Sequence, residues 1–307
     1  MTGEGREEQY FFGTIHKYKG TDHLFENLKM KRSLKIRKTG WLLLSVACIL
    51  VFAFGAVVFG TDSKKEKSRS IGERYHQETV LDWRGVAGDL FRARPQKPPL
   101  YKIYPQAKAI PLPRPGERGM SVEEAIEKRR SVRNYSSAPL PLSALARLLL
   151  SAQGVTGKAY GTMLRSAPSA GALYPIEIYP VVNNVKGLAR GIYHYHIKKH
   201  YLELVKQGDF RSEITGAGLE QEMLGEADVT LVITAVFNRI RSKYGERGFR
   251  YVYMEAGHVS QNIYLQSVSL GLGSVSVGAF FDEKVNRLIG VDGDKEAAIY
   301  LHAVGTL

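Results

Sequence analysis

The most constraining feature of this 307-residue chain is an uncharged apolar run at residues 41–60, WLLLSVACILVFAFGAVVFG. In an α-helix, a run of this length extends about 30 Å, which matches the hydrocarbon core of a bilayer. Trp41 at its edge suits an anchor at the membrane interface. The run therefore predicts a single transmembrane helix that divides the chain into two parts.

Two other interpretations of this run remain open. One is a buried helix of a soluble domain. The other is a cleaved signal peptide, because Met30 as an alternative start would place the basic stretch MKRSLKIRKTG directly before the run. The run is long for a signal peptide and lacks a clear small-x-small cleavage site, so we favour an uncleaved anchor.

Basic residues flank the run on both sides, six of them within residues 29–38 and five within residues 64–74. The tighter block before the run favours a cytoplasmic N-terminus and a C-terminal domain on the extracytoplasmic side. The formal net charge is +13. Because much of the excess surrounds an apolar run and no nucleic-acid-binding signature is present, a membrane surface is the expected partner and nucleic acid is not.

Composition divides the chain into four parts. Residues 1–40 form a polar, basic tail, and residues 41–60 form the predicted span. Residues 61–118 form a charged and then Pro-rich linker, in which proline disfavours regular helix and favours an extended chain. Residues 119–307 form the predicted folded domain.

The folded domain alternates helix and strand patterns without strict βαβ repetition, which predicts an α+β fold with one central sheet. A capping box at Ser121 predicts the first helix, and apolar periodicity and turn residues predict the other elements. The expected helices are 121–130, 142–152 and 251–270; the expected strands are 176–183, a hairpin over 191–205, 228–237, 274–280 and 297–304.

Two segments indicate a site for a phosphorylated cofactor. In RRSVRNY, the guanidinium groups of Arg129 and Arg133 flank the Ser131 hydroxyl, and such a cluster can neutralise a phosphate dianion. In PSAGALYP, at residues 168–175, small residues allow the backbone to approach a flat ligand closely. The first segment alone would fit a solvated helix end equally well, but the pair favours a bound cofactor.

A third segment, GLGSVSVGAF at residues 271–280, leaves a predicted helix through glycine and enters a strand. On its own it also fits a helix cap before a core strand. Its glycines do not follow the order of a Rossmann dinucleotide site, and no P-loop or nucleophile elbow occurs. The only cysteine, Cys48, lies in the apolar run, which excludes cysteine chemistry in a soluble domain. His194 and His196 lack partners at ligand spacing, so no metal site is predicted.

Together these segments resemble the FMN-dependent nitroreductase superfamily, and most closely its SagB-type branch, the azoline dehydrogenases. The resemblance extends from about residue 75 to the end and includes the segments GIYHYH, TAVFNR, KYGERGFRY and EAGHVSQNIYLQ in the same order. It implies a nitroreductase-like α+β fold, with a central mixed or antiparallel sheet flanked by helices. It also implies a homodimer with FMN at the subunit interface.

The resemblance assigns a role to each segment. The first would hold the FMN phosphate and ribityl chain, the second would line the flavin from the partner subunit, and the third would present a backbone N–H to flavin N5. A donor at N5 stabilises the reduced flavin. The residues assigned to FMN in this way are Arg129, Ser131, Arg133, Pro168, Ser169, Ala170, Gly171, Val277 and Gly278.

The resemblance also assigns catalysis to Lys243 and Tyr244. A neighbouring cation favours the phenolate form of tyrosine, and such a group can remove a proton α to a carbonyl while hydride leaves the adjacent carbon. Arg241, Arg247 and Arg250 could add to the positive field or bind an acidic substrate group. The alternative is a polar loop after the strand at 228–237.

The end of the chain departs from the family pattern. Many relatives carry a basic residue after the last strand that helps to hold the phosphate, whereas this sequence ends at Val304-Gly305-Thr306-Leu307. Phosphate binding is therefore expected to depend more on Arg129 and Arg133, with a lower affinity for FMN.

The sequence thus predicts a membrane-anchored FMN-dependent oxidoreductase. It would remove a hydride and a proton from a heterocyclic or other small, peptide-derived substrate, and oxygen or a quinone-like acceptor would reoxidise the flavin. One alternative is an NAD(P)H-dependent reductase of nitro compounds or quinones. An alternative of another class is a non-catalytic, membrane-tethered docking subunit of a biosynthetic complex, which the missing C-terminal basic residue motivates.

Overall fold

The computed structural model describes residues 70–80, 92–114, 116, 119–159 and 161–307. The chain divides into two compact units, residues 1–74 and residues 75–307. The first unit contributes only the start of helix α2 (Ile71–Glu78) to the described part. The predicted tail and the apolar run at 41–60 lie outside the described residues. No helix within the described ranges is long and apolar enough to cross a bilayer.

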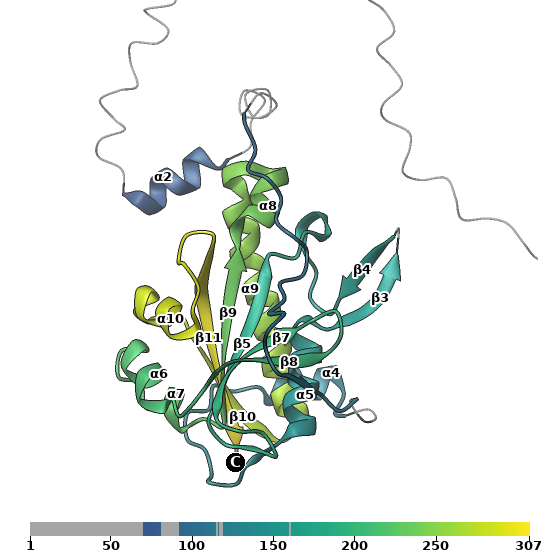
Figure 1. Ribbon diagram of the computed structural model, residues 1–307, viewed down its shortest axis with the longest axis vertical. Coiled ribbons are helices and arrows are strands. Elements are labelled where there is room, and N and C mark those ends of the chain that lie inside the picture. Colours follow the sequence, from purple (N-terminus) through teal and green to yellow (C-terminus); the bar gives the residue numbers. More distant parts are fainter. Residues whose placement is uncertain (1–69, 81–91, 115, 117–118, 160) are drawn as a thin grey trace, which may run out of the picture. The chain divides into compact units, whose positions relative to one another are not determined.

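The second unit is built on a seven-stranded sheet with the order β1-β8-β7-β5-β9-β11-β10, in which every neighbouring pair is antiparallel (Figure 1). This arrangement confirms the α+β prediction and specifies the sheet as antiparallel. The strands are β1 (Ala109–Pro111), β5 (Ile176–Val182), β7 (Gly191–His196), β8 (Tyr201–Gln207), β9 (Val229–Val236), β10 (Leu272–Val277) and β11 (Glu296–Thr306). Small sheets pair β2 (Leu140–Pro141) with β6 (Val185–Lys186) and β3 (Val155–Ala159) with β4 (Thr162–Arg165).

Helices bury both faces of the central sheet. Strand β9 is buried along its whole length, and its side chains alternate between two cores because successive strand residues point to opposite faces. Leu231 and Ile233 belong to the core beneath α5 and α9, whereas Val232 belongs to the core beneath the other helices. The helices are α4 (Val122–Lys128), α5 (Leu142–Gln153) and α9 (Gly248–Ser269) on one face, and α6 (Arg211–Ala217), α7 (Met223–Glu226) and α10 (Asp282–Ile289) on the other.

Most elements with a clear sequence pattern form where they were predicted. Helix α4 begins after Ser121, whose Oγ accepts the Glu124 N–H at 3.2 Å, as the capping box requires. The predicted helix at 251–270 is α9, which begins three residues earlier, at Gly248. The hairpin over 191–205 forms β7 and β8.

The Pro-rich segment belongs to the folded unit rather than to a linker alone. Its strand β1 pairs with β8 at the edge of the central sheet. Upstream of β1, the Pro99 carbonyl accepts a hydrogen bond from Arg239 Nε at 2.8 Å, and the Tyr104 N–H donates to Glu203 at 3.0 Å. Proline prevents helix formation but leaves its carbonyl free to accept from a buried side chain. The folded unit therefore begins well before residue 119, where the sequence placed the start of the domain.

Candidate active site

The RRSVRNY segment leaves α4 and runs beside strand β10. Arg129 caps the C-terminus of α4, and beyond it the Val132 N–H donates to a carbonyl of β10 at 2.9 Å. Val132 packs so closely on Gly273 that a Cβ added to the glycine would lie 2.8 Å from the valine side chain. Because an extended chain alternates its side chains, Ser131 and Arg133 face away from this contact, and both are exposed.

Tyr264, on α9, joins this segment to β10. Its Oη lies 3.2 Å from Ser131 Oγ and accepts the Ser276 N–H at 2.8 Å, and the Arg129 guanidinium lies 5.1 Å from the ring centre. Burial acts to raise the pKa of Tyr264, but the hydrogen bonds with Ser131 and Ser276 and the charge of Arg129 outweigh it and hold the pKa below its ordinary value. Tyr264 has no signal of its own in the sequence, where it is one more polar residue of a helix.

The end of β10 offers an accessible backbone next to Tyr264. Val277 is buried, whereas Gly278 is exposed, and a Cβ added there would meet only the Tyr300 ring, at 3.8 Å. The Tyr300 hydroxyl is 2.8 Å from Ser276 Oγ, which fixes this end of the strand. The first and third sequence segments therefore lie side by side, with Tyr264 between them.

The PSAGALYP segment forms a tight turn before β5. Gly171, Ala172 and Tyr174 have φ angles of 61°, 52° and 44°, in the left-handed region, which costs a non-glycine residue about 1–2 kcal/mol. A hydrogen bond inside the turn stabilises it, because Ser169 Oγ accepts the Tyr174 N–H at 2.8 Å. The four residues predicted to line a flavin are all exposed or half-buried: Pro168, Ser169, Ala170 and Gly171.

Lys243 and Tyr244 lie in the last turn of helix α8 (Phe237–Tyr244), rather than in a polar loop. The Lys243 Nζ is 5.3 Å from the centre of the Tyr244 ring. A Cβ added to Gly171 would lie 2.9 Å from Tyr244 Oη and 3.1 Å from Lys243 Nζ. The fold therefore brings the predicted catalytic pair directly against the PSAGALYP turn.

The two groups of predicted residues lie at different places along α9. Tyr251 packs against Tyr244 with ring centres 4.9 Å apart, whereas Tyr264 contacts Ser131. The interval from Tyr251 to Tyr264 corresponds to about 20 Å of helix. No hydrogen bond or ion pair found among the described residues joins the RRSVRNY segment to the PSAGALYP turn. Within one chain, the two halves of the candidate site are separate.

The arginines near the catalytic pair are bound within the chain. Arg241 forms an ion pair with Glu246 at 2.5 Å. Arg247 donates to the Tyr251 hydroxyl at 2.8 Å and to the Thr79 carbonyl, and Arg250 donates to the Thr79 hydroxyl. Arg247 and Arg250 thus bind the chain that follows α2, instead of pointing to an open substrate site.

A buried carboxyl group lies behind the PSAGALYP turn. Glu255, on α9, is 2% exposed, and the amide of the fully buried Gln153 donates to its Oε1 at 3.4 Å. Burial raises the pKa of Glu255 to about 7, although the Ser169 hydroxyl and the Arg165 charge favour the ionised form. Glu255 belongs to the EAGHVSQNIYLQ segment, but no role could be predicted for it, because a glutamate in a helix is ordinarily exposed.

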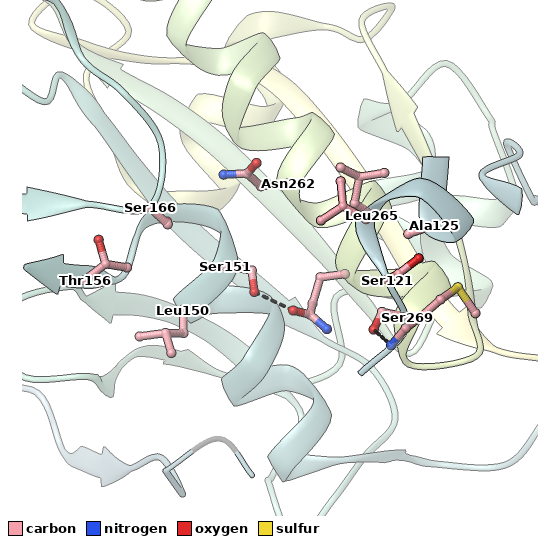
Figure 2. Close-up of a pocket in the computed structure, with 12 residues that line it drawn as sticks. Ser121, Ala125, Leu150, Ser151, Thr156, Ser166, Asn262, Leu265 and Ser269 are labelled. Carbon is pink, nitrogen blue, oxygen red and sulfur yellow. Dashed lines mark hydrogen bonds between the residues drawn. The ribbon is translucent and has the colours of Figure 1, made fainter. Parts of the chain in front are cut away.

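A cavity of about 360 Å³ opens between α4, α5 and α9 (Figure 2). Two hydrogen bonds cross its wall, from Ser151 Oγ to Gln266 at 2.7 Å and from the Met120 N–H to Ser269 Oγ at 3.1 Å. Asn262, on α9, also lines it. The cavity contains neither the arginine cluster nor the Lys243–Tyr244 pair.

The residues present fit FMN. In the described part of the chain, no carboxylate forms an ion pair with Arg129 or Arg133, so both guanidinium groups are available to a phosphate. The Ser131 hydroxyl adds a hydrogen-bond donor between them. At the other half of the site, Lys243 Nζ and Tyr244 Oη lie directly against the backbone of Gly171, where they would face a ring system bound on the turn.

Three known proteins are similar to this chain in sequence or in structure. A protein from Methanocaldococcus jannaschii named as a nitroreductase is 42% identical over 61% of this chain and 91% of its own length. The microcin B17-processing protein McbC of Escherichia coli is 30% identical over 47% of this chain, and the match spans only 55% of McbC. The solved structure of a nitroreductase-like protein from Ralstonia eutropha superposes with a TM-score of 0.56 at 28% identity, covering 70% of this chain and 97% of that one.

The family model for nitroreductases matches residues 126–306, which is more than half of the chain. The match includes the arginine cluster, the PSAGALYP turn, the Lys243–Tyr244 pair and the end of β10. The chain belongs to the nitroreductase family of oxidoreductases.

Proposed function

We propose that this protein is an FMN-dependent dehydrogenase of the SagB-type branch, acting on a heterocyclic or other small, peptide-derived substrate. The contact between Gly171 and the Lys243–Tyr244 pair is the observation that carries the proposal. It brings a proton-accepting pair against the turn that would line the flavin. The similarity to McbC, which processes microcin B17, supports a peptide-derived substrate.

Bound FMN would supply the acceptor for two electrons, taken from the substrate as a hydride. Tyr244, with the Lys243 ammonium beside its ring, would accept the proton from the carbon next to the one that loses hydride. Since Lys243 lies at the C-terminal end of α8, the helix dipole favours its positive charge there. Arg129, Ser131 and Arg133 would hold the phosphate, and the backbone at Val277 and Gly278 would face the flavin N5.

The protein would act as a homodimer. The two halves of the site are separate in one chain, so a two-fold partner would place its PSAGALYP turn beside the arginine cluster of the first subunit. Apolar side chains on α4 support this arrangement, since Val122 and Ile126, one turn apart on this helix, are 63% and 56% exposed. Neighbouring exposed apolar side chains of this kind mark protein interfaces.

Residues 41–60 would anchor the enzyme in a membrane as a single-pass helix, with the catalytic domain on the extracytoplasmic side. The proposal rests on the length and apolar character of this run and on the distribution of basic residues around it. An epitope placed at the C-terminus and a protease added to intact cells would test it. Cleavage of the domain from outside would support this orientation, and protection of the domain would contradict it.

Two alternatives predict different results when flavin reduction is measured. An NAD(P)H-dependent nitro or quinone reductase would show rapid bleaching of the flavin on addition of NAD(P)H. A docking subunit would show no substrate-dependent reduction, although the Lys243–Tyr244 pair and the arginine cluster argue against lost chemistry. The decisive experiment is to purify the full chain in mild detergent, record its visible spectrum for bound FMN, and follow flavin reduction against a panel of peptide-derived azolines and NAD(P)H.

A further inference from the structure

A chain of four hydroxyl groups runs from the RRSVRNY segment to the end of β10. Ser131 Oγ lies 3.2 Å from Tyr264 Oη, which lies 3.2 Å from Ser276 Oγ. Ser276 Oγ in turn lies 2.8 Å from the Tyr300 hydroxyl. The chain therefore connects α9, β10 and β11 to the segment that carries the arginine cluster. Three of these residues, Tyr264, Ser276 and Tyr300, have no role in the proposed function.

The two ends of this hydroxyl chain differ in their surroundings. Ser131 is exposed, and Tyr264 Oη is the one hydrogen-bond partner of its side chain among the described residues. Tyr300, at the other end, packs beside Gly278, where an added Cβ would lie 3.8 Å from the ring. Tyr264, in the middle, is 8% exposed, so the centre of the chain is largely shielded from water. A ligand from solvent can therefore reach the chain at Ser131.

The Ser276 N–H limits how the protons of the chain can be arranged. It donates to Tyr264 Oη at 2.8 Å, so the single proton of the Tyr264 hydroxyl is left for Ser131 or for Ser276 Oγ. If that proton goes to the Ser131 oxygen, the proton of Ser131 is free to point outward. If it goes to Ser276 Oγ, Ser131 donates its own proton to Tyr264 and has none left for a ligand.

A phosphate dianion can only accept hydrogen bonds, so it favours the first of these arrangements. We propose that Tyr264 is a positioning residue for phosphate binding, because its hydroxyl donates to the Ser131 oxygen and leaves the Ser131 proton to the ligand. The inference rests on the proposed function, in which Ser131 and two arginines hold the FMN phosphate. Its effect belongs to the phosphate group, since the flavin ring would bind at other residues.

The test compares FMN with riboflavin, which has the same ring system and ribityl chain but no phosphate. Tyr264→Phe removes the hydroxyl and keeps the aromatic ring beside the Arg129 guanidinium. With the flavin-free full chain at about pH 8, where the phosphate is a dianion, the variant should bind FMN about three- to tenfold more weakly, the value of one hydrogen bond. Its Kd for riboflavin should stay within about twofold of the wild-type value. Equal weakening for both ligands would mean that Tyr264 only supports the end of β10, and would overturn the inference.

Tyr135→Phe is the matched control. The Tyr135 hydroxyl donates to the Val132 carbonyl at 3.1 Å. This variant therefore also removes a tyrosine hydroxyl that is bonded to the RRSVRNY segment, but not one that is bonded to Ser131. It should leave the ratio of the FMN and riboflavin dissociation constants unchanged. A change in this ratio as large as that in Tyr264→Phe would also overturn the inference.

Two further variants test the connection between the hydroxyl groups. Ser131→Ala should weaken FMN binding by a similar factor, and adding Tyr264→Phe to it should cause little further loss, because the two changes interrupt one path. Losses that simply add would contradict the inference. Ser276→Ala keeps the backbone N–H and removes the competing acceptor of the Tyr264 proton, so FMN affinity should not fall.

The Ser276→Ala result decides the question even where Tyr264→Phe does not fold. Weaker FMN binding with unchanged riboflavin binding in Ser276→Ala would overturn the inference and leave the proposed function standing. A wild type that binds neither flavin, or that binds FMN no more tightly than riboflavin, would overturn the assigned phosphate site and the inference with it.

Discussion

The backbone of Gly171 lies so close to Tyr244 that a methyl group on the glycine would lie 2.9 Å from the phenol oxygen. The same methyl group would lie 3.1 Å from Lys243 Nζ. Gly171 also has a φ of 61°, so glycine meets two requirements at once, space and left-handed geometry. The turn and the Lys243–Tyr244 pair therefore form one surface.

Gly171→Ala should impair chemistry more than stability. The new methyl group would displace Lys243 and Tyr244 and slow substrate-dependent flavin reduction. Gly187→Ala is the matched control, because Gly187 has a φ of 80° but no atom near an added Cβ. Both variants should lose about 1–2 kcal/mol of stability from backbone strain. Equal reduction rates in the two variants, measured by stopped flow, would contradict the close contact as the cause.

Lys243→Ala and Tyr244→Phe should retain FMN and lose about 10²- to 10⁴-fold in the rate of substrate-dependent reduction, as expected when a general base is removed. Tyr251→Phe is the control, because this neighbouring ring packs edge-on against Tyr244 without belonging to the pair. The visible spectrum reports retained FMN, and bleaching reports the rate. An undiminished rate in both catalytic variants would exclude the assigned roles.

Arg239→Met should be strongly destabilising. The guanidinium is 2% exposed, pairs with Glu177 at 2.6 Å and donates to the Pro99 carbonyl, so its removal leaves the buried Glu177 carboxylate without its arginine partner, with His194 still at 3.1 Å. The expected loss is about 3–5 kcal/mol in denaturant unfolding. Arg241→Met breaks the accessible pair with Glu246, a long hydrogen bond to Asn238 and the contact with the Phe249 ring, and should cost at most about 1 kcal/mol. Similar losses for the two variants would disprove this ranking.

Ile126→Glu should convert the proposed dimer into monomers and weaken FMN binding, because each FMN site would need residues from two subunits. Ile126 is 56% exposed on α4. Phe281→Glu introduces the same charge at a side chain that is 47% exposed beside α10, and it should leave the dimer intact. Light scattering during size-exclusion chromatography measures the mass. A wild type that is monomeric with FMN bound would rule out the shared site.

The regular elements could be predicted because each has a local pattern. Strand β9 is an almost continuous apolar run, and α9 repeats apolar residues on one face. The short helix α7 spans only Met223–Glu226, too few residues for a periodic signal. Strand β1 lies in a Pro-rich stretch that reads as a linker, and only its pairing with β8 makes it part of the sheet.

The sequence predicted which segments belong to the candidate site, but it did not predict the contacts between them. Arg129 and Gly171 could be singled out because they belong to the RRSVRNY and PSAGALYP segments, which together indicate a site for a phosphorylated cofactor. Tyr264 and Glu255 do not stand out, since their roles depend on contacts with residues far away in the sequence, such as Ser131 and Gln153. A helical pattern shows which face is apolar, but it does not show which polar side chain on that helix is buried.

The most direct test of the central claim is FMN retention after charge reversal in the arginine cluster. Arg129→Glu combined with Arg133→Glu should release the flavin, because two carboxylates would replace the cations that are proposed to hold its phosphate. Arg130→Glu is the control, since Arg130 is exposed and donates to the Glu127 and Arg129 carbonyls. We expect a colourless double variant and a yellow control, measured by absorbance after gel filtration. A double variant that keeps FMN with wild-type affinity would contradict the role assigned to Arg129 and Arg133.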